Sequence, residues 1–173
     1  DKAATSGGGA RTASCKMSLG IDGFIYIEHT TAEQLSSAKR DEMMIKMGKE
    51  DYRNHDPFPI WHPQDPGSAG LDSAQAFNNL LANNGLIGLF EQVTGSKEFY
   101  ADILATKAMG GHVRVIRAEW NDPFLDEMAA FPKGRFKDRV DAASSAYNYL
   151  RKIIEGGGTQ KTASATATVV DAD

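Results

Sequence analysis

The stretch ASCKMSL-GIDG-FIYIEH, residues 13–29, decides the fold. Its two outer runs, 13–19 and 24–29, have the composition of short β-strands, and the four residues between them begin and end with glycine. Glycine readily adopts the backbone conformations that tight turns between strands require. We therefore predict an antiparallel β-hairpin over residues 13–29.

Helix-like and strand-like segments alternate after this hairpin. Apolar residues recur at helical spacing over 31–48, where Thr31 and Gln34 form a candidate capping box and Gly48 a candidate stop. The expected order continues with a strand at 58–62, a helix at 71–83, a strand at 86–90, a helix at 96–109, a strand at 112–118 and helices at 123–130 and 139–154. This order predicts an α/β domain with a mixed sheet flanked by helices.

Length and composition predict one soluble domain. The chain has 173 residues, of which 41% are hydrophobic and 24% charged, and no window approaches the ~18 consecutive apolar residues of a membrane helix. The single cysteine, Cys15, excludes an internal disulfide and a cysteine-based zinc site, and it favours a reducing compartment.

The charge is divided unevenly along the chain. The net charge of -4 argues at first against a protein that wraps nucleic acid. Residues 1–104 carry 9 basic and 14 acidic side chains, whereas residues 105–155 carry 9 basic and 7 acidic ones. The two parts are therefore expected to face different partners.

The two ends of the chain differ from its middle. The chain opens at Asp1 without an initiator methionine and reads like a fragment of a longer polypeptide. Residues 155–173 contain a glycine run followed by a Thr/Ala/Ser-rich segment without apolar periodicity. We expect a folded domain over 1–154 and a flexible C-terminal tail over 155–173.

Acidic residues at predicted strand ends are the first candidates for a functional site, because open α/β sheets bind ligands there. Asp1 precedes a Gly-rich run and stands where a first strand would end. Asp65 follows the strand at 58–62, within the segment QDPGSAG at 64–70. Asp65 is either a turn and helix-capping residue or a carboxylate beside a small-residue loop that a phosphate can approach closely.

A third candidate segment, FPKGRFKDRVDA, spans residues 131–142. Its cations are Lys133, Arg135, Lys137 and Arg139, and its carboxylates are Asp138 and Asp141. Residues three apart share one helix face, so Asp138 and Asp141 point the same way if a helix has begun there. Asp138 is either a helix cap in a salt-bridged first turn or part of a metal site, with the cations binding phosphates.

Together these segments resemble the C-terminal nuclease domain of phage terminase large subunits. The resemblance runs from Asp1 to about Leu150 and also includes TGSK at 94–97, and EWN at 119–121 followed by Phe124 and Leu125. It implies an RNase H-like fold, in which an antiparallel hairpin is followed by parallel strands and helices. It also implies an endonuclease that cuts concatemeric viral DNA during genome packaging.

The resemblance places the metal-binding and catalytic carboxylates at Asp1, Asp65 and the late pair Asp138 and Asp141. The family commonly has two adjacent aspartates in the late motif, and here Arg139 takes the place of the second, so either Asp138 or Asp141 completes the site. The family's early glycine-aspartate pair is replaced by Ala10-Arg11-Thr12. Two Mg²⁺ or Mn²⁺ ions are the implied cofactors.

The implied partners are double-stranded DNA, bound through Lys133, Arg135, Lys137 and Arg139, the portal, the small terminase subunit and an N-terminal ATPase domain of the same polypeptide. The implied location is the host cytoplasm. This chain has no phosphate-binding loop of the Gly-x-x-x-x-Gly-Lys-Ser/Thr type, so it is not itself the packaging motor. Two alternatives stay open: a catalytically weak module that guides DNA or docks on the portal, and another RNase H-like nuclease such as a junction resolvase.

Overall fold

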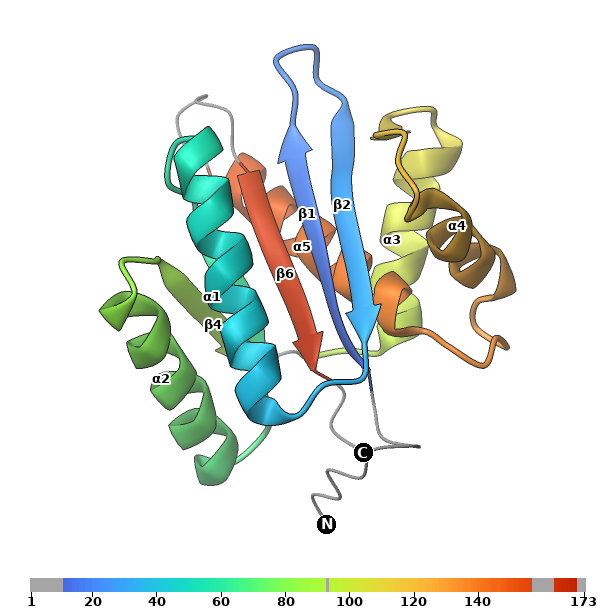
Figure 1. The fold of residues 1–173 in the computed structure, drawn as a ribbon. Helices are drawn as coiled ribbons and strands as arrows, with labels where there is room; N and C mark the ends of the chain where they lie inside the picture. Colours follow the sequence, from blue (N-terminus) through green and yellow to red (C-terminus); the bar gives the residue numbers. More distant parts are fainter. Residues whose placement is uncertain (1–10, 93, 157–163, 171–173) are drawn as a thin grey trace.

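A computed structural model describes residues 11–92 and 94–156, together with the backbone of 164–170 (Figure 1). Its centre is a six-stranded sheet in the order β4-β3-β6-β1-β2-β5. Strand β1 (Thr12–Leu19) is antiparallel to both of its neighbours, whereas the pairs β4–β3, β3–β6 and β2–β5 are parallel. The predicted mixed sheet flanked by helices is therefore confirmed.

The predicted hairpin is confirmed as β1 and β2 (Ile25–Glu33), which pair from Leu19↔Ile25 to Thr12↔Glu33. Gly23 has a φ of 78°, a conformation that glycine adopts without a Cβ clash. Strand β2 is longer than expected and includes Thr31, so the capping box predicted at Thr31 and Gln34 is wrong. Helix α1 (Ser37–Asn54) instead begins after Ser36, whose side chain accepts a hydrogen bond from the Lys39 amide.

The segment that we expected to be a flexible tail contributes a strand to the middle of the sheet. Strand β6 (Ser164–Val170) lies between β1 and β3 (Ile60–Gln64). It pairs along β1 from Thr12↔Val170 to Ser18↔Ser164, and it pairs with Ile60 and Trp61 of β3. The rest of the expected tail beyond residue 156 lies outside the described residues.

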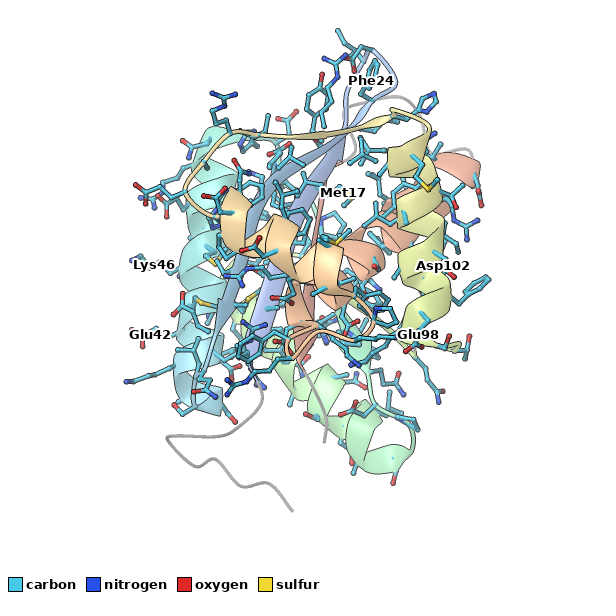
Figure 2. The ribbon with its side chains drawn as sticks, turned by 90° about the vertical axis from the view of Figure 1, so that its right-hand side faces the viewer. Met17, Phe24, Glu42, Lys46, Glu98 and Asp102 are labelled. Atoms are coloured by element: carbon cyan, nitrogen blue, oxygen red, sulfur yellow. The ribbon has the colours of Figure 1, made fainter. Side chains whose placement is uncertain are left out.

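One face of the sheet is covered by α5 (Asp138–Glu155), with α3 (Lys97–Met109) and α4 (Asn121–Ala130) beside it (Figure 1). Ala13, Cys15 and Met17 of β1 are buried against this layer, and Figure 2 shows Met17 in the interior. Small α5 residues such as Ala143 and Ala146 let the helix approach the sheet closely. Each large side chain buried here contributes about 1.5–3 kcal/mol of hydrophobic stabilisation.

The opposite face is covered by α1 and α2 (Ser68–Asn83). Met44 of α1, Ile60 of β3 and Leu81 of α2 form its core. Gly48 does not end α1 as predicted but lies inside the helix, where a Cβ would stand 2.8 Å from a methyl group of Ile60. Gly48 is therefore a contact point between helix and sheet.

Two short elements complete the described fold. Strand β4 (Gly88–Gln92) forms one edge of the sheet, and β5 (Val113–Val115) forms the other. Strand β5 lies within the predicted strand at 112–118, and β4 overlaps the predicted strand at 86–90 but ends two residues later. None of the helices among the described residues is both long and apolar enough to span a membrane.

Candidate functional site

All three described acidic candidates lie at one end of the sheet. We call it the carboxyl end, because β2, β3, β4 and β6 finish there and β1 begins there. The register shows this directly: Gln64 of β3 pairs with Gln92 of β4, and Thr12 of β1 pairs with both Glu33 and Val170. The loop after β3 and the residue before β1 therefore lie at this end, as do the start of α5, which contacts Arg11, and the start of α3, which contacts the start of α5.

Asp65 is the first residue after β3, and it is exposed. It does not cap α2, because Gly67 occupies the N-cap position with a φ of 87° and no side chain caps the helix. A Cβ on Gly70 would lie 2.1 Å from the Asp65 carbonyl oxygen, so only glycine lets the first turn of α2 pack against this backbone. The helix-capping interpretation of Asp65 is thus wrong, and its carboxylate faces solvent.

Asp138 belongs to a group of charges, two buried carboxylates and two partly buried arginines, that we call the inner network: Arg11, Glu127, Asp138 and Arg139. Arg11 Nε donates to Asp138 Oδ2 at 2.5 Å, and Arg11 Nη2 donates to Glu127 Oε2 at 2.9 Å. Burial by itself lowers the pKa of Arg11, but the hydrogen bonds to Glu127 and Asp138 outweigh it and the pKa is raised. Asp138 is the first helical residue rather than the helix cap, which is Lys137.

Arg139 is the fourth member of the inner network and contacts Glu127. Its backbone amide donates to Glu127 Oε1 at 2.6 Å, and its Nη1 lies 3.4 Å from Glu127 Oε2. Arg139 was predicted to contact DNA, yet its side chain is 14% exposed and paired within the protein. It is therefore less accessible than Lys133, Arg135 and Lys137, which are exposed.

Asp141, one turn further along α5, faces a different partner. Its Oδ2 lies 2.8 Å from the Nζ of Lys97, the first residue of α3. We call Lys97 and Asp141 the outer pair, because the lysine side chain is 56% exposed whereas that of Asp141 is 4% exposed. Asp138 and Asp141 are thus each neutralised by a cation from a different element.

The remaining predicted DNA contacts precede α5. Lys133, Arg135 and Lys137 are all exposed, as a DNA-contacting surface requires. Phe136 lies between two cations, with the Arg11 guanidinium 3.9 Å and the Arg135 guanidinium 5.0 Å from its ring centroid. These contacts order the segment next to the inner network.

The carboxylates that the sequence singled out are not gathered into one cluster within the described part of the chain. Over 11–92, 94–156 and 164–170, no three His, Cys, Asp or Glu side chains come together as a group that could hold a metal ion. Asp1, the fourth predicted ligand, lies outside the described residues. Mg²⁺ and Mn²⁺ prefer carboxylate oxygens as ligands, but among the described residues Asp141 is paired with Lys97 rather than gathered with other carboxylates.

His62 lies near the Asp65 loop but belongs to the interior. Its Nε2 is 3.1 Å from Asn78 Oδ1, and its ring packs against Phe77 and Phe90. Burial lowers the pKa of His62, so the imidazole is neutral at pH 7. This environment indicates a structural role.

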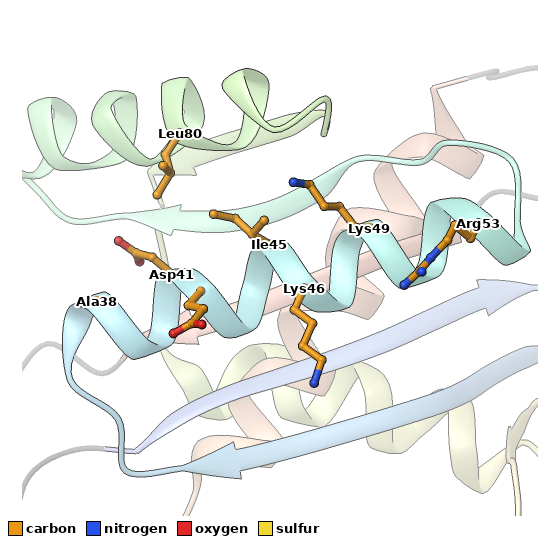
Figure 3. Close-up of a pocket in the computed structure, with 8 residues that line it drawn as sticks. Ala38, Asp41, Ile45, Lys46, Lys49, Arg53 and Leu80 are labelled. Atoms are coloured by element: carbon orange, nitrogen blue, oxygen red, sulfur yellow. The ribbon is translucent and has the colours of Figure 1, made fainter.

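A separate groove lies between α1 and α2 (Figure 3). It has a volume of about 590 Å³ and is lined by charges of both signs, among them Asp41, Lys46 and Lys49, with Ile45 and Leu80 as apolar residues. These helices cover the sheet face opposite to α5. The groove therefore lies on the other face of the sheet from α5 and its two aspartates.

Sequence reasoning missed three residues of the site: Arg11, Lys97 and Glu127. Arg11 stood out only as a departure from the family pattern, and Lys97 only as part of the TGSK segment. A signal existed for Lys97, because a cation after a small-residue loop at a strand end is placed to meet an anion.

Comparison with known proteins identifies no family, since no protein-family model matches the chain and no curated protein sequence matches it.

Proposed function

We propose that this chain is a divalent-metal-dependent DNA endonuclease of the type found as the nuclease domain of phage terminase large subunits. The observation that carries the proposal is that Asp65 and the late aspartates all lie at the same end of a mixed sheet. An antiparallel hairpin followed by parallel strands and helices is also the order expected of an RNase H-like domain. The endonuclease activity is inferred from the resemblance in sequence motifs.

The proposed site uses Asp65 and the late aspartates, with Asp1 as a further ligand. Divalent ions held by these carboxylates would supply an activated water and a counter-charge for the leaving 3′ oxygen. Exposed Lys133, Arg135 and Lys137 would bind backbone phosphates, which position DNA without reading its sequence. Cleavage with little sequence preference is the expected outcome.

The wider role follows from the same proposal. The substrate would be concatemeric double-stranded viral DNA in the host cytoplasm. The partners would be the portal, the small terminase subunit and an ATPase domain on the same polypeptide. Each of these rests on the resemblance alone.

A second candidate is a catalytically weak module that guides DNA or docks on the portal. The contacts of Asp138 favour this candidate, because the partly buried guanidinium of Arg11 binds the carboxylate that a metal would need. Such a module would keep the basic surface and lose the metal chemistry. The two candidates therefore differ in cleavage and agree in DNA binding.

Plasmid nicking separates them. We expect the wild-type chain to nick supercoiled DNA with Mn²⁺ or Mg²⁺ and to stop when EDTA is added. Asp65→Ala should lower the nicking rate on the order of 100-fold or more, because a ligand worth several kcal/mol in the transition state is lost. Asp72→Ala, an exposed aspartate in α2, is the matched control and should leave the rate unchanged.

Binding of labelled duplex DNA is measured in parallel. Metal-independent binding without nicking by the wild type would favour the guiding or docking module. Equal nicking by wild type and Asp65→Ala would show that Asp65 does not belong to the catalytic site. The endonuclease proposal would then lose its main support.

A further inference from the structure

Phe136 is an exposed aromatic residue within the basic segment that precedes α5. It is 43% exposed, and Lys133, Arg135 and Lys137 around it in the sequence are exposed as well. Within the described part of the chain, none of these three cations forms an ion pair with an acidic side chain. The segment therefore offers a ligand both a flat apolar surface and positive charges that no carboxylate neutralises.

The inner network holds the ring of Phe136 in place. The Arg11 guanidinium lies 3.9 Å from the ring centroid, a cation–π contact, and Arg11 is itself bound by Glu127 and Asp138. Because the Arg11 side chain is only 14% exposed, it covers one face of the ring from the protein side. The ring is thus positioned before any ligand binds.

The backbone on both sides of Phe136 is attached to α4. The Gly134 amide donates to the Ala130 carbonyl at 2.7 Å, and the Arg139 amide donates to Glu127 Oε1 at 2.6 Å. A segment that is already ordered loses little conformational entropy when it binds a ligand. The basic segment is therefore a preorganised surface.

The chemistry of this surface fits a nucleotide base that is not paired. Bases of every kind stack on aromatic side chains, and cations beside the ring bind the phosphates before and after the stacked base. Inside a duplex both faces of a base are covered by its neighbours, so an unpaired base is the one that can stack on Phe136. The guanidinium of exposed Arg135 is 5.0 Å from the ring centroid, a looser contact than that of Arg11.

We propose that Phe136 is a stacking platform for an unpaired base of single-stranded DNA, with Lys133, Arg135 and Lys137 binding the adjacent phosphates. This binding needs neither a metal ion nor cleavage. Asp138 of the proposed site follows Phe136 by two positions, so the platform would hold an unpaired strand next to the cleavage site. That use of the platform rests on the proposed endonuclease function.

Fluorescence anisotropy of labelled oligonucleotides in EDTA tests the platform in the wild-type chain. The probes are an oligothymidylate of about 12 nucleotides, an abasic strand of the same length and a duplex of the same length. The wild type should bind the oligothymidylate about 5- to 150-fold more tightly than the abasic strand, which corresponds to the ~1–3 kcal/mol of one base stack. Equal affinity for the two strands overturns the proposal.

Substitutions at Phe136 test whether this residue carries the preference. Phe136→Ala should abolish it, and so should Phe136→Leu, which keeps an apolar side chain against Arg11 but has no aromatic face. Phe136→Tyr should retain it. The matched control is Phe99→Ala, which removes an exposed phenylalanine of α3 and should bind all three probes like wild type. A preference that survives in both Phe136→Ala and Phe136→Leu overturns the proposal.

Binding at several salt concentrations tests the phosphate contacts. Lys133→Met and Lys137→Met should each weaken binding of the oligothymidylate and the abasic strand by the same factor. Each should also reduce the slope of log affinity against log salt by about 0.7, the value for one phosphate contact on a single strand. Unchanged slopes in both variants overturn these contacts.

The outcomes distinguish this inference from the proposed function. Equal binding of the oligothymidylate and the abasic strand, together with metal-dependent nicking by wild type, overturns the platform and leaves the endonuclease standing. A preference for the oligothymidylate that is lost in Phe136→Ala, without nicking by wild type, supports the platform and contradicts the endonuclease. Absence of binding to all three probes contradicts both the platform and the proposed DNA surface.

Discussion

The inner network and the outer pair hold two aspartates of the same helix turn in opposite ways. Asp138 is bound by a partly buried arginine that also binds Glu127, whereas Asp141 is bound by a lysine that is mostly in solvent. Both carboxylates are themselves buried. The difference teaches that the role of an acidic residue here depends on how easily its partner can leave.

The largest effect on stability is expected when the side chain of Arg11 is removed. Arg11→Met leaves Glu127 and Asp138 buried without their shared guanidinium, so the free energy of unfolding should fall by about 3–5 kcal/mol. Urea denaturation followed by circular dichroism measures the loss. A loss below about 1 kcal/mol would show that the inner network is no more tightly held than the outer pair.

A lysine in place of the arginine sharpens the comparison. Arg11→Lys retains the charge but replaces a planar fork by a single ammonium, which cannot reproduce both the Nε bond to Asp138 and the Nη2 bond to Glu127. The free energy of unfolding should fall by about 1–3 kcal/mol, the cost of a buried acceptor left without a donor. Full retention of stability would mean that charge alone, without the fork, holds Asp138.

The smallest effect is expected at the outer pair. Lys97→Met should lower the free energy of unfolding by about 1–2 kcal/mol, because the lost lysine charge is largely solvated whereas Asp141 is left buried without it. Raising the salt from about 50 mM to about 500 mM should shrink even this difference, since exposed charges are screened. A difference that does not change with salt would place Lys97 in a protected contact like that of Arg11.

The sequence predicted the local parts of the fold because their signals are local. The hairpin at 13–29 has strand-like runs around a glycine turn, and α5 has an apolar stripe. Strand β6 was missed because its Thr/Ala/Ser-rich segment follows a glycine run and has no apolar periodicity, although its Thr and Val residues favour strands. Strand propensity depends on neighbours in the sheet, and those of β6 are β1 and β3, which lie far away in the sequence.

Only the acidic residues of the candidate site were predictable from the sequence. Asp65, Asp138 and Asp141 stand after a strand or at the expected start of a helix, where spacing alone suggests chemistry. Their partners are different, because Arg11 meets Asp138 across 127 positions and Glu127 across 116. Ion pairs over such separations depend on how the elements pack, and no local pattern encodes them.

Strand β6 also has a consequence for biosynthesis. During translation β1 emerges early, but the partner on one of its two sides is made only when residues 164–170 leave the ribosome. Until then the facing borders of β1 and β3 both have unpaired backbone groups, which invite pairing with other chains. The sheet is therefore completed late, through contacts between the first and last described strands, and such distant pairing slows folding.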